Sequence, residues 1–460
     1  MNPQAPQSDT VSHAAQAPDV SNSAERPLGS VPHDVARESL AQASMAEPAI
    51  AELKPNVSAP PGMFTAMEFR DFRYMWSGNF LSNIGTWMQN IALGWLVLQL
   101  TNSAFWLGMV SFASSVPLLI FTLVGGVIAD HVNKRKLLIW SQAAMMMSAF
   151  LLALLTFRNQ VTVTQIMVLA FATGLASALA APSQQALLPQ LVPRRILTNA
   201  VGLNSAQFNM SRILGPTVGG FAMAWMGASG NFFLNGLSFL AVIFALWQMH
   251  YPAQTAVPEG SWWKRLLDGF RYVFGDPRPK VLVLQVAVCG LLGIPYLSFI
   301  PFFARDILHR DARGLGLLMA FSGLGAFLGA LTIAYFGKPQ RRGKVIMVCG
   351  VIFYSSILAF TFSTSFFLSA FMQTLAGYFL IIMVAIINTR LQLLAPDELR
   401  GRAMSIYATA YLGLPPIGSF LAGSLSRWVS APHAIAAMAA AGLIAFLLIF
   451  ASHKDLWELD

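Results

Sequence analysis

The chain has 460 residues, of which 56% are hydrophobic and only 11% are charged. Soluble proteins carry roughly 25% charged residues, so this composition excludes an ordinary soluble protein and indicates a chain that lies in a membrane. The formal net charge of +9 reflects short basic loops without interleaved aromatic residues, which argues against a nucleic-acid-binding protein.

Residues 1–62 differ from the rest of the chain in composition. They contain many prolines, alanines and serines and no aromatic residue. Such a segment buries too little apolar surface to offset the entropy lost on ordering, and it has no apolar core typical of a signal peptide. We therefore expect a disordered cytoplasmic tail, which either binds a regulator or partner or is an unconstrained extension.

The remaining chain is dominated by apolar stretches of about 20 residues, the length that a helix needs to cross a bilayer. The hydropathy pattern predicts twelve such spans, near 75–99, 105–129, 136–157, 163–181, 199–225 and 231–249, and then near 281–303, 313–336, 344–363, 366–389, 402–426 and 433–451. The sequence thus predicts an all-α integral membrane protein with two six-helix halves. These halves are 63–249 and 281–451, with a linker at 250–280 and a short end at 452–460.

Basic residues are distributed unequally between the loops. Of the 29 Lys and Arg residues, 20 lie in segments on the side of the termini and five in the loops on the opposite side. Loops with an excess of Lys and Arg stay in the cytoplasm. We therefore expect a multi-pass protein of the cytoplasmic (inner) membrane with both termini in the cytoplasm.

The first span carries a row of polar residues at helical spacing, Asn79, Asn83, Thr86 and Asn90. Intervals of three and four positions place them on one face of the helix. Polar side chains in a membrane helix must face protein or water. The row therefore predicts either the wall of a central cavity or hydrogen bonds between helices without contact to a ligand.

The loop between the second and third spans reads GVIADHVNKRK from residue 126. It resembles the loop signature of major facilitator superfamily transporters, Gly-x-x-x-Asp-(Arg/Lys)-x-Gly-(Arg/Lys)-(Arg/Lys). The matching residues are Gly126, Asp130, Lys134 and Arg135. His131 and Asn133 depart from the signature, and Asn133 replaces a glycine, although Asn also tolerates a left-handed backbone. The resemblance implies a gating loop; the alternative is a loop that is basic only because cytoplasmic loops generally are.

The fifth span contains a second signature. Its small residues have the spacing found in antiporters of the same superfamily, at Gly202, Ser211, Gly215, Pro216 and Gly219, and Ser211 stands where a glycine is usual. Small residues let a neighbouring helix approach closely, and a proline frees a backbone carbonyl. The resemblance implies export rather than import, whereas the alternative is the ordinary enrichment of Gly and Pro in membrane helices.

Arg212 is the one charged residue deep inside a predicted span. Its insertion costs roughly 2.5–3.5 kcal/mol, so it needs a partner or a wet cavity. We expect it either to bind an anionic group of a ligand or to form a structural bond with neighbouring carbonyls and amides. Gln207 in the same span and Gln285 in the seventh span are further candidates for the cavity wall.

The two halves resemble each other weakly, with Pro193 and Gly215 corresponding to Pro396 and Gly418. This agrees with two parallel, pseudo-symmetric halves related by an axis along the membrane normal. Between them, residues 261–276 place apolar side chains on one face of a helix and charged ones on the other. This pattern predicts an amphipathic helix on the cytoplasmic membrane surface.

No carboxylate lies in the middle of any predicted span, so a proton as coupling ion is implied only by the family resemblance. Cys289 and Cys349 fall inside spans, and their spacing matches no metal-binding pattern. The spans also lack clustered His, Asp and Glu and a nucleophile–base pair, which argues against an enzyme. The sequence indicates no cofactor.

The stretch from Phe69, FRDFRYMWSGNFLSNIGTWMQNIALGWLV, together with PRRILTNAVGLNS and GPTVGG, carries a narrower resemblance. It resembles the bacterial branch of the superfamily that contains enterobactin-type siderophore exporters and macrolide efflux pumps. This implies the major facilitator fold and a secondary active exporter of a small molecule, a siderophore-like metabolite or a drug. The alternatives are an importer of the same fold and a non-transporting membrane sensor that uses the tail. The expected partners are the small-molecule substrate, membrane lipid and the implied proton.

Overall fold

The computed structural model describes residues 62, 64–131, 133–249, 262–337 and 342–452. Of residues 122–131, 262–268, 397 and 398 it describes the backbone only. The predicted tail, apart from Gly62, and the last eight residues lie outside this part of the chain. Every regular element in the described part is a helix.

The helices of the first part of the chain form the N-terminal group. It comprises η1 (Thr65–Glu68), α2 (Arg70–Thr101), α3 (Ala104–His131), α4 (Lys134–Phe157), α5 (Val163–Leu187), η2 (Leu188–Gln190), η3 (Arg194–Ile196) and α6 (Leu197–Gln248). Within it α2 packs on α6, α3 packs on α5, and α4 packs on both α5 and α6.

The remaining helices form the C-terminal group. It comprises α7 (Trp262–Gly275), α8 (Pro277–Val288), η4 (Cys289–Gly293), η5 (Ile294–Phe299), α9 (Ile300–Phe302), η6 (Phe303–Ile307), α10 (Ala312–Phe336), α11 (Arg342–Thr361), α12 (Phe366–Leu394), α13 (Asp397–Ala408), η7 (Thr409–Gly413), α14 (Leu414–Leu425) and α15 (Ala431–Ser452). Helix α12 packs against both α10 and α11, and α15 packs on α11.

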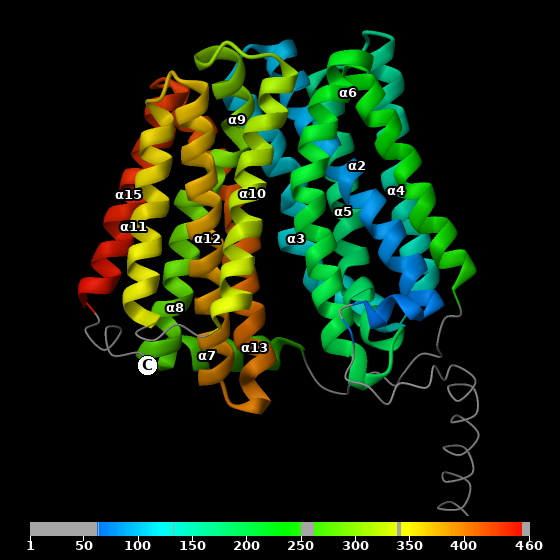
Figure 1. Ribbon diagram of the computed structural model, residues 1–460, viewed down its shortest axis with the longest axis vertical. Helices are drawn as coiled ribbons and strands as arrows, with labels where there is room; N and C mark the ends of the chain where they lie inside the picture. The colour runs from blue at the N-terminus through cyan, green and yellow to red at the C-terminus, as the bar shows by residue number, and fades with distance from the viewer. Residues whose placement is uncertain (1–61, 63, 132, 250–261, 338–341, 453–460) are drawn as a thin grey trace, which may run out of the picture. The chain divides into compact units, whose positions relative to one another are not determined.

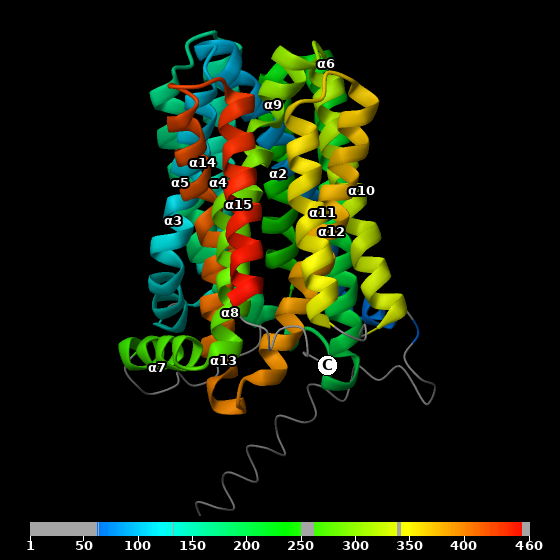
Figure 2. The same cartoon turned by 90° about the vertical axis from the view of Figure 1, so that its left-hand side faces the viewer.

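The long helices run side by side, and the two groups lie next to each other (Figures 1 and 2). We call the end of the bundle where α2 begins and α15 ends the terminal end. The opposite end, where α2 is followed by α3, is the far end. The two groups contact each other chiefly through α6 with α10 and through α3 with α14.

Nine helical segments of the described part are long and apolar enough to cross a membrane. Three features separate this number from the twelve predicted spans. Helix α2 is long enough, but its polar row lowers its hydropathy. The segment Arg194–Gln248 contains the predicted fifth and sixth spans in one helical run, and the segment from Asp397 to Leu425 is divided into three shorter helices. The predicted all-α membrane fold is confirmed, and a helix lies at the place of each predicted span.

The predicted fifth and sixth spans are joined through a single non-helical residue. Gly227 has a φ of 69° and a ψ of −174°, a conformation that is accessible mainly to glycine. The two predicted spans are therefore joined at one non-helical residue and not by a loop. The hydropathy pattern instead predicts an interval of several residues between them.

The predicted seventh and eleventh spans are irregular rather than continuous α-helices. The seventh contains π-helical turns at Cys289–Gly293 and Phe303–Ile307, separated by a short 3₁₀ segment and a short α-helix, and the eleventh contains one at Thr409–Gly413. Prolines near these turns, such as Pro295 and Pro415, cannot donate a backbone hydrogen bond. Turns of this kind are frequent at functional sites. Both irregular spans contribute to the site described below.

The buried apolar side chains form one cluster shared by both groups at the far end and separate clusters at the terminal end. The largest cluster fills the C-terminal group and continues into the far-end parts of α2 and α3, for example at Leu98 and Leu107. A second cluster lies at the terminal end, and its described members, such as Phe72, Leu187 and Leu246, all belong to the N-terminal group. The two groups therefore share a core at the far end and have separate cores at the terminal end.

Helix α7 lies across the ends of the other helices at the terminal end, as both views show (Figures 1 and 2). The Tyr272 hydroxyl donates a hydrogen bond to the main-chain oxygen of Leu394 at 2.9 Å, which fixes α7 to the end of α12. Burial and the neighbouring Asp276 carboxylate raise the pKa of Tyr272. A helix therefore forms where the sequence predicts an amphipathic one, and its location on a membrane surface stays a prediction.

Candidate functional site

At the far end the two groups meet through glycines. A Cβ on Gly220 of α6 would lie 2.7 Å from the main-chain oxygen of Ala312 and 3.0 Å from the Cα of Gly316, both on α10. A Cβ on Gly108 of α3 would overlap the main-chain oxygen of Ser419 on α14. Cβ atoms are essentially never found within 3.0 Å of another heavy atom, so both approaches require glycine.

Arg305 adds a polar contact between the groups at the same end. Its guanidinium donates to the main-chain oxygen of Leu98 at 2.8 Å and to the Asn102 side chain at 2.6 Å. It also forms an ion pair with Asp306 at 2.9 Å. Asn102 ends α2 with a left-handed φ of 52°, a conformation that asparagine tolerates. Arg305 thus ties the far end of α2 to the C-terminal group.

Next to this junction, a cavity of about 250 Å³ lies between the two groups. Its walls come from α3, from the irregular seventh and eleventh spans and from α14, through Ser111, Ser115, Ile294, Leu297, Ser298, Tyr411, Leu412, Pro415, Pro416 and Ser419. The Ser298 hydroxyl is hydrogen-bonded to those of Ser111 at 3.0 Å and Ser419 at 3.1 Å. These three hydroxyls connect the groups and present polar atoms among apolar walls.

Arg212 also lies between the groups. Its guanidinium carbon is 5.9 Å from the ring centre of Trp87 on α2. Its main-chain oxygen lies against Gly323 of α10. Arg212 is half-buried, and the ion pairs found among the described residues do not include it. An aromatic face stabilises the cation without neutralising its charge, so the guanidinium can still bind an anionic group.

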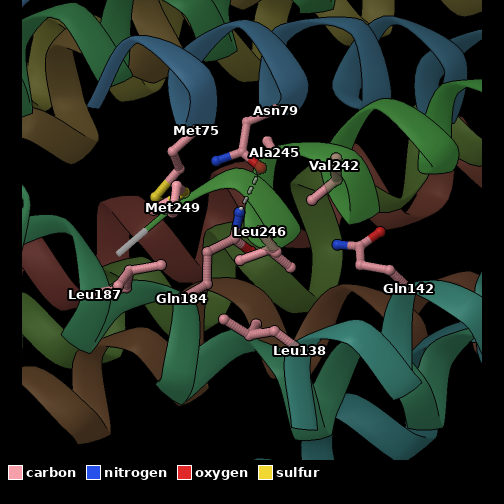
Figure 3. Close-up of a pocket in the computed structure, with 10 residues that line it drawn as sticks. All are labelled: Met75, Asn79, Leu138, Gln142, Gln184, Leu187, Val242, Ala245, Leu246 and Met249. Carbon is pink, nitrogen blue, oxygen red and sulfur yellow. Dashed lines mark hydrogen bonds between the residues drawn. The ribbon is translucent and has the colours of Figure 1, made fainter. Parts of the chain in front are cut away.

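The polar row of α2 does not face one common space. Asn79 is buried inside the N-terminal group, where its side chain accepts a hydrogen bond from Gln184 of α5 at 3.1 Å. Figure 3 shows this pair at a small pocket with Gln142 on the opposite wall. The pocket measures about 10 Å³, which is room for about one water molecule. The Gln142 side-chain oxygen has no partner among the described residues, so a buried water there would satisfy it.

The other members of the row have different surroundings. The Asn83 amide donates to Gln207 of α6 at 3.5 Å, and Gln207 is itself buried. Thr86 and Asn90 are exposed. Asn79 and Asn83 therefore make the interhelical hydrogen bonds that were one of the two expected roles. Thr86 and Asn90 leave their side chains accessible, as residues of a cavity wall require.

Gln285 is fully buried in α8. Neither its side-chain oxygen nor its nitrogen has a hydrogen-bond partner in the described part of the chain. It is not among the residues that line the 250 Å³ cavity. A buried amide without partners costs free energy unless water satisfies it, so its place in a cavity wall stays a prediction.

The end of α3 and the start of α4 hold the predicted gating-loop residues Gly126, Asp130, Lys134 and Arg135. Asp130 belongs to the segment whose backbone alone is described. The Arg135 guanidinium donates to the main-chain oxygen of Trp247 at 2.8 Å, which holds α4 to the end of α6. Asn133 does not use the left-handed backbone: its φ is −56°, and its side chain caps α4 by accepting from the Lys136 amide at 3.2 Å.

Two glycines of the second signature pack α6 against α2. A Cβ on Gly219 would lie 2.8 Å from the Cα of Met88, and one on Gly215 would lie 2.9 Å from the main-chain oxygen of Ile84. Gly202 differs, because a Cβ there would meet no atom within 4 Å. Close packing therefore accounts for Gly215 and Gly219 and not for Gly202.

The remaining two positions of this signature have their own contacts. The Ser211 hydroxyl is buried and donates to the main-chain oxygen of Gln207 at 2.8 Å, so serine satisfies its polar group within α6. The main-chain oxygen of Pro216 faces α10, where a Cβ on Gly316 would lie 2.6 Å from it. The signature thus places α6 between α2 and α10, at the junction of the two groups.

This geometry can be compared with known proteins. Residues 62–459 match the family model described as transmembrane secretion effector. The chain belongs to this family. The membership confirms the resemblance to major facilitator superfamily transporters that the loop signature and the stretch from Phe69 indicate.

Several relatives of this chain are transporters or efflux proteins. The staphyloferrin A transporter of Staphylococcus aureus is 24% identical over 63% of this chain and 75% of its own length. The multidrug efflux pump Tap of Mycolicibacterium fortuitum is 25% identical over 73% of this chain and 84% of its length. The enterobactin exporter EntS of Citrobacter koseri is 24% identical over 81% of this chain and 89% of its length. The predicted branch, with siderophore exporters and efflux pumps, is confirmed.

Among solved structures, the nucleoside transporter NupG is similar in fold. The comparison gives a TM-score of 0.68 and 15% identity, and it covers 83% of this chain and 98% of that chain. At this identity the likeness concerns the fold alone. The predicted major facilitator fold is confirmed.

Proposed function

We propose that this chain is a secondary active transporter that exports a small molecule across the cytoplasmic membrane by alternating access. Membership of a transporter family supports the class, and relatives that are an efflux pump and a siderophore exporter support the direction. The observation that carries the mechanism is the difference between the two ends of the bundle. The groups share a core and close glycine contacts at the far end, whereas their cores are separate at the terminal end.

This difference is what alternating access requires of one of its two states. Rocking of two rigid halves opens a central site first to one side of the membrane and then to the other. In the state described here the far end is closed by Gly108, Gly220 and Arg305. The site between the groups is then reached from the terminal end, which we place in the cytoplasm. We propose 63–249 and 281–451 as the two halves that rock, with residues 250–280, which include α7 and the start of α8, as the linker.

We propose a substrate that carries anionic or strongly hydrogen-bond-accepting groups, as siderophore-like metabolites do. Arg212 offers a guanidinium between the groups that takes part in no ion pair among the described residues, and the hydroxyls of Ser111, Ser298 and Ser419 offer polar atoms in the cavity between the same groups. Two of the relatives are named for siderophores, staphyloferrin A and enterobactin. A drug is the alternative substrate, in line with the multidrug efflux pump.

A proton is the coupling ion that the family resemblance supports. The carboxylates whose side chains are described lie at helix ends, at Glu68, Asp71, Asp276, Asp306 and Asp311. Asp306 is paired with Arg305 at the far-end junction. Among these five carboxylates we propose Asp306 for the coupling. It alone is paired with a residue, Arg305, that contacts the other group.

Transport in membrane vesicles of known orientation tests the proposed function. Everted vesicles that contain the chain should take up a labelled catecholate siderophore when their interior is made acidic, and a protonophore should abolish the uptake. Right-side-out vesicles should show none. Uptake only into right-side-out vesicles would make the chain an importer. Absence of uptake of the siderophore and of a labelled macrolide, in both orientations, would contradict the proposal.

Orientation has a test of its own. The excess of Lys and Arg on the side of the termini predicts that Asn133 and Arg341 lie in the cytoplasm, so green fluorescent protein fused at either residue should fluoresce. Fusions at Asn102, Gly230 and Ser365 should be active only in the periplasm. Alkaline phosphatase and green fluorescent protein report the two sides. A reversed result at two of these five sites would overturn the proposed location of the termini.

A further inference from the structure

A second cavity lies away from the contact between the two groups. It is a groove of about 360 Å³ between the terminal-end parts of α10 and α11, and α12 forms its floor. Phe336, Lys344 and Val348 line it and are exposed, so it opens on the outer surface of the C-terminal group. It shares no lining residue with the cavity between the groups.

The groove is mostly apolar, with polar side chains inside it at Thr332 and Tyr378 and at its mouth at Lys344. Apolar side chains from all three helices, among them Val345, Val348 and Ile382, form most of its wall. Inside it, the hydroxyls of Thr332 and Tyr378 are hydrogen-bonded at 3.1 Å. These two hydroxyls satisfy each other, so the interior of the groove can accommodate a hydrocarbon chain without leaving a polar group unpaired.

The mouth of the groove lies at the terminal end, where α10 stops. Gly337 ends α10 with a φ of 68°, a backbone conformation that residues other than glycine rarely adopt. Tyr335 and Phe336 beside it are 85% and 76% exposed. Exposed aromatic residues at a helix end are typical of the membrane–water interface, so we expect the mouth at the level of the lipid head groups.

The mouth carries positive charge. Lys344, in the first turn of α11, lines the groove and is exposed, and Arg342 begins the same helix. The segment from Gly337 to Lys344 reads GKPQRRGK and contains no acidic residue. No acidic side chain is among the described residues that line the groove. Basic residues at this level attract anionic head groups.

We propose that this groove binds one anionic phospholipid, with an acyl chain between α10 and α11 and the phosphate at Lys344. The occupant must have a long apolar part for the interior of the groove and an anionic group for its mouth. A membrane phospholipid has both, in its acyl chain and its phosphate. The lipid fills the space between two helices of the C-terminal group that otherwise leave a gap. This site is independent of the substrate and of the direction of transport.

The test is a titration of the purified full-length protein with single lipids, followed by native mass spectrometry. Wild type should bind one phosphatidylglycerol molecule more tightly than phosphatidylcholine. Lys344→Ala should weaken the binding of phosphatidylglycerol about five-fold, since one basic residue near a membrane surface contributes an attraction of that size. It should leave the binding of phosphatidylcholine unchanged, and Lys344→Arg should bind both lipids as wild type does.

A second variant tests the acyl-chain part of the groove without changing the charge. Val348→Trp places a large side chain in the groove and should remove the tight adduct of either lipid. The matched controls are Val168→Trp on the exposed surface of α5 and Arg278→Ala at the terminal end of α8, neither of which lines the groove. Both controls should bind as wild type does. Tight binding of phosphatidylglycerol to Val348→Trp, or an equal loss in Arg278→Ala and Lys344→Ala, would overturn the proposal.

Discussion

Replacing Gly108 or Gly220 by alanine is expected to reduce transport by about tenfold or more, because either methyl group would oppose closure of the far end. It would press on a main-chain oxygen of the facing group, that of Ser419 or of Ala312. Overpacking of this kind costs about 1–3 kcal/mol, and the cost falls only on the state in which the far end is closed. The equilibrium between the two states should therefore shift about tenfold or more toward the other state. Uptake into everted vesicles measures the loss.

A distance measurement separates closure from other causes of lost transport. Spin labels at Gln160 and Thr364, on exposed loops of the two groups at the far end, should move apart in both variants. Gly401→Ala in α13 is the matched control, because it makes the same chemical change where a Cβ meets no atom within 4 Å. It should transport as wild type does. Equal loss in Gly401→Ala, or lost transport with unchanged label distances, would show that far-end closure is not the step affected.

The places of the helices could be predicted because a bilayer demands apolar runs of a fixed length, and such runs are visible in the sequence. The breaks inside the seventh and eleventh spans could not. Residues 289–293 and 409–413 are about as apolar as their neighbours, and the π-helical turns that they form contact each other. A Cβ on Gly290 would overlap the main-chain oxygen of Ala410, a residue far away in the sequence. Hydropathy carries no information on such contacts.

Some residues of the candidate site could likewise be predicted from the sequence and others could not. Arg212 could be singled out because a charge in an apolar run is rare and costly. The three hydroxyls could not, because serine is a common small residue in membrane helices, and Ser111, Ser298 and Ser419 come together only when α3, η5 and α14 meet. In the sequence, Arg305 is only one of the five basic residues in the loops on the side opposite the termini. Its contact with Asn102 joins residues about 200 positions apart, and no local pattern indicates it.

The polar row of α2 shows how far periodicity alone can be taken. Spacing predicts a common face, but residues on one face of a long helix meet different neighbours at different depths. Asn79 meets α5 near the terminal end, and Asn83 meets α6 one turn further on. Separating the cavity wall from interhelical hydrogen bonds therefore needs the positions of the other helices, which the spacing does not contain.

Substitution of Arg212 should change transport of an anionic siderophore more than substitution of any residue that lines the cavity between the groups. Arg212→Lys keeps the charge but loses the planar fork of donors that matches a carboxylate or catecholate, and Arg212→Ala removes both. A hydrogen bond to a charged group contributes about 1.5–3 kcal/mol. Uptake of the siderophore should fall about tenfold in the lysine variant and about a hundredfold in the alanine variant. Initial rates over a range of concentrations in everted vesicles measure both losses.

Two comparisons make this result specific to the site. Arg194→Ala removes the same charge from an exposed position that precedes the same helix, so it should transport the siderophore as wild type does. Membrane content of every variant is matched by immunoblot, because loss of a buried arginine can also reduce insertion. A neutral macrolide needs no cation, so its transport should be nearly equal in wild type and all three variants. If the siderophore behaved as the macrolide does, Arg212 would be a structural residue held by Trp87, and drug efflux would become the better assignment.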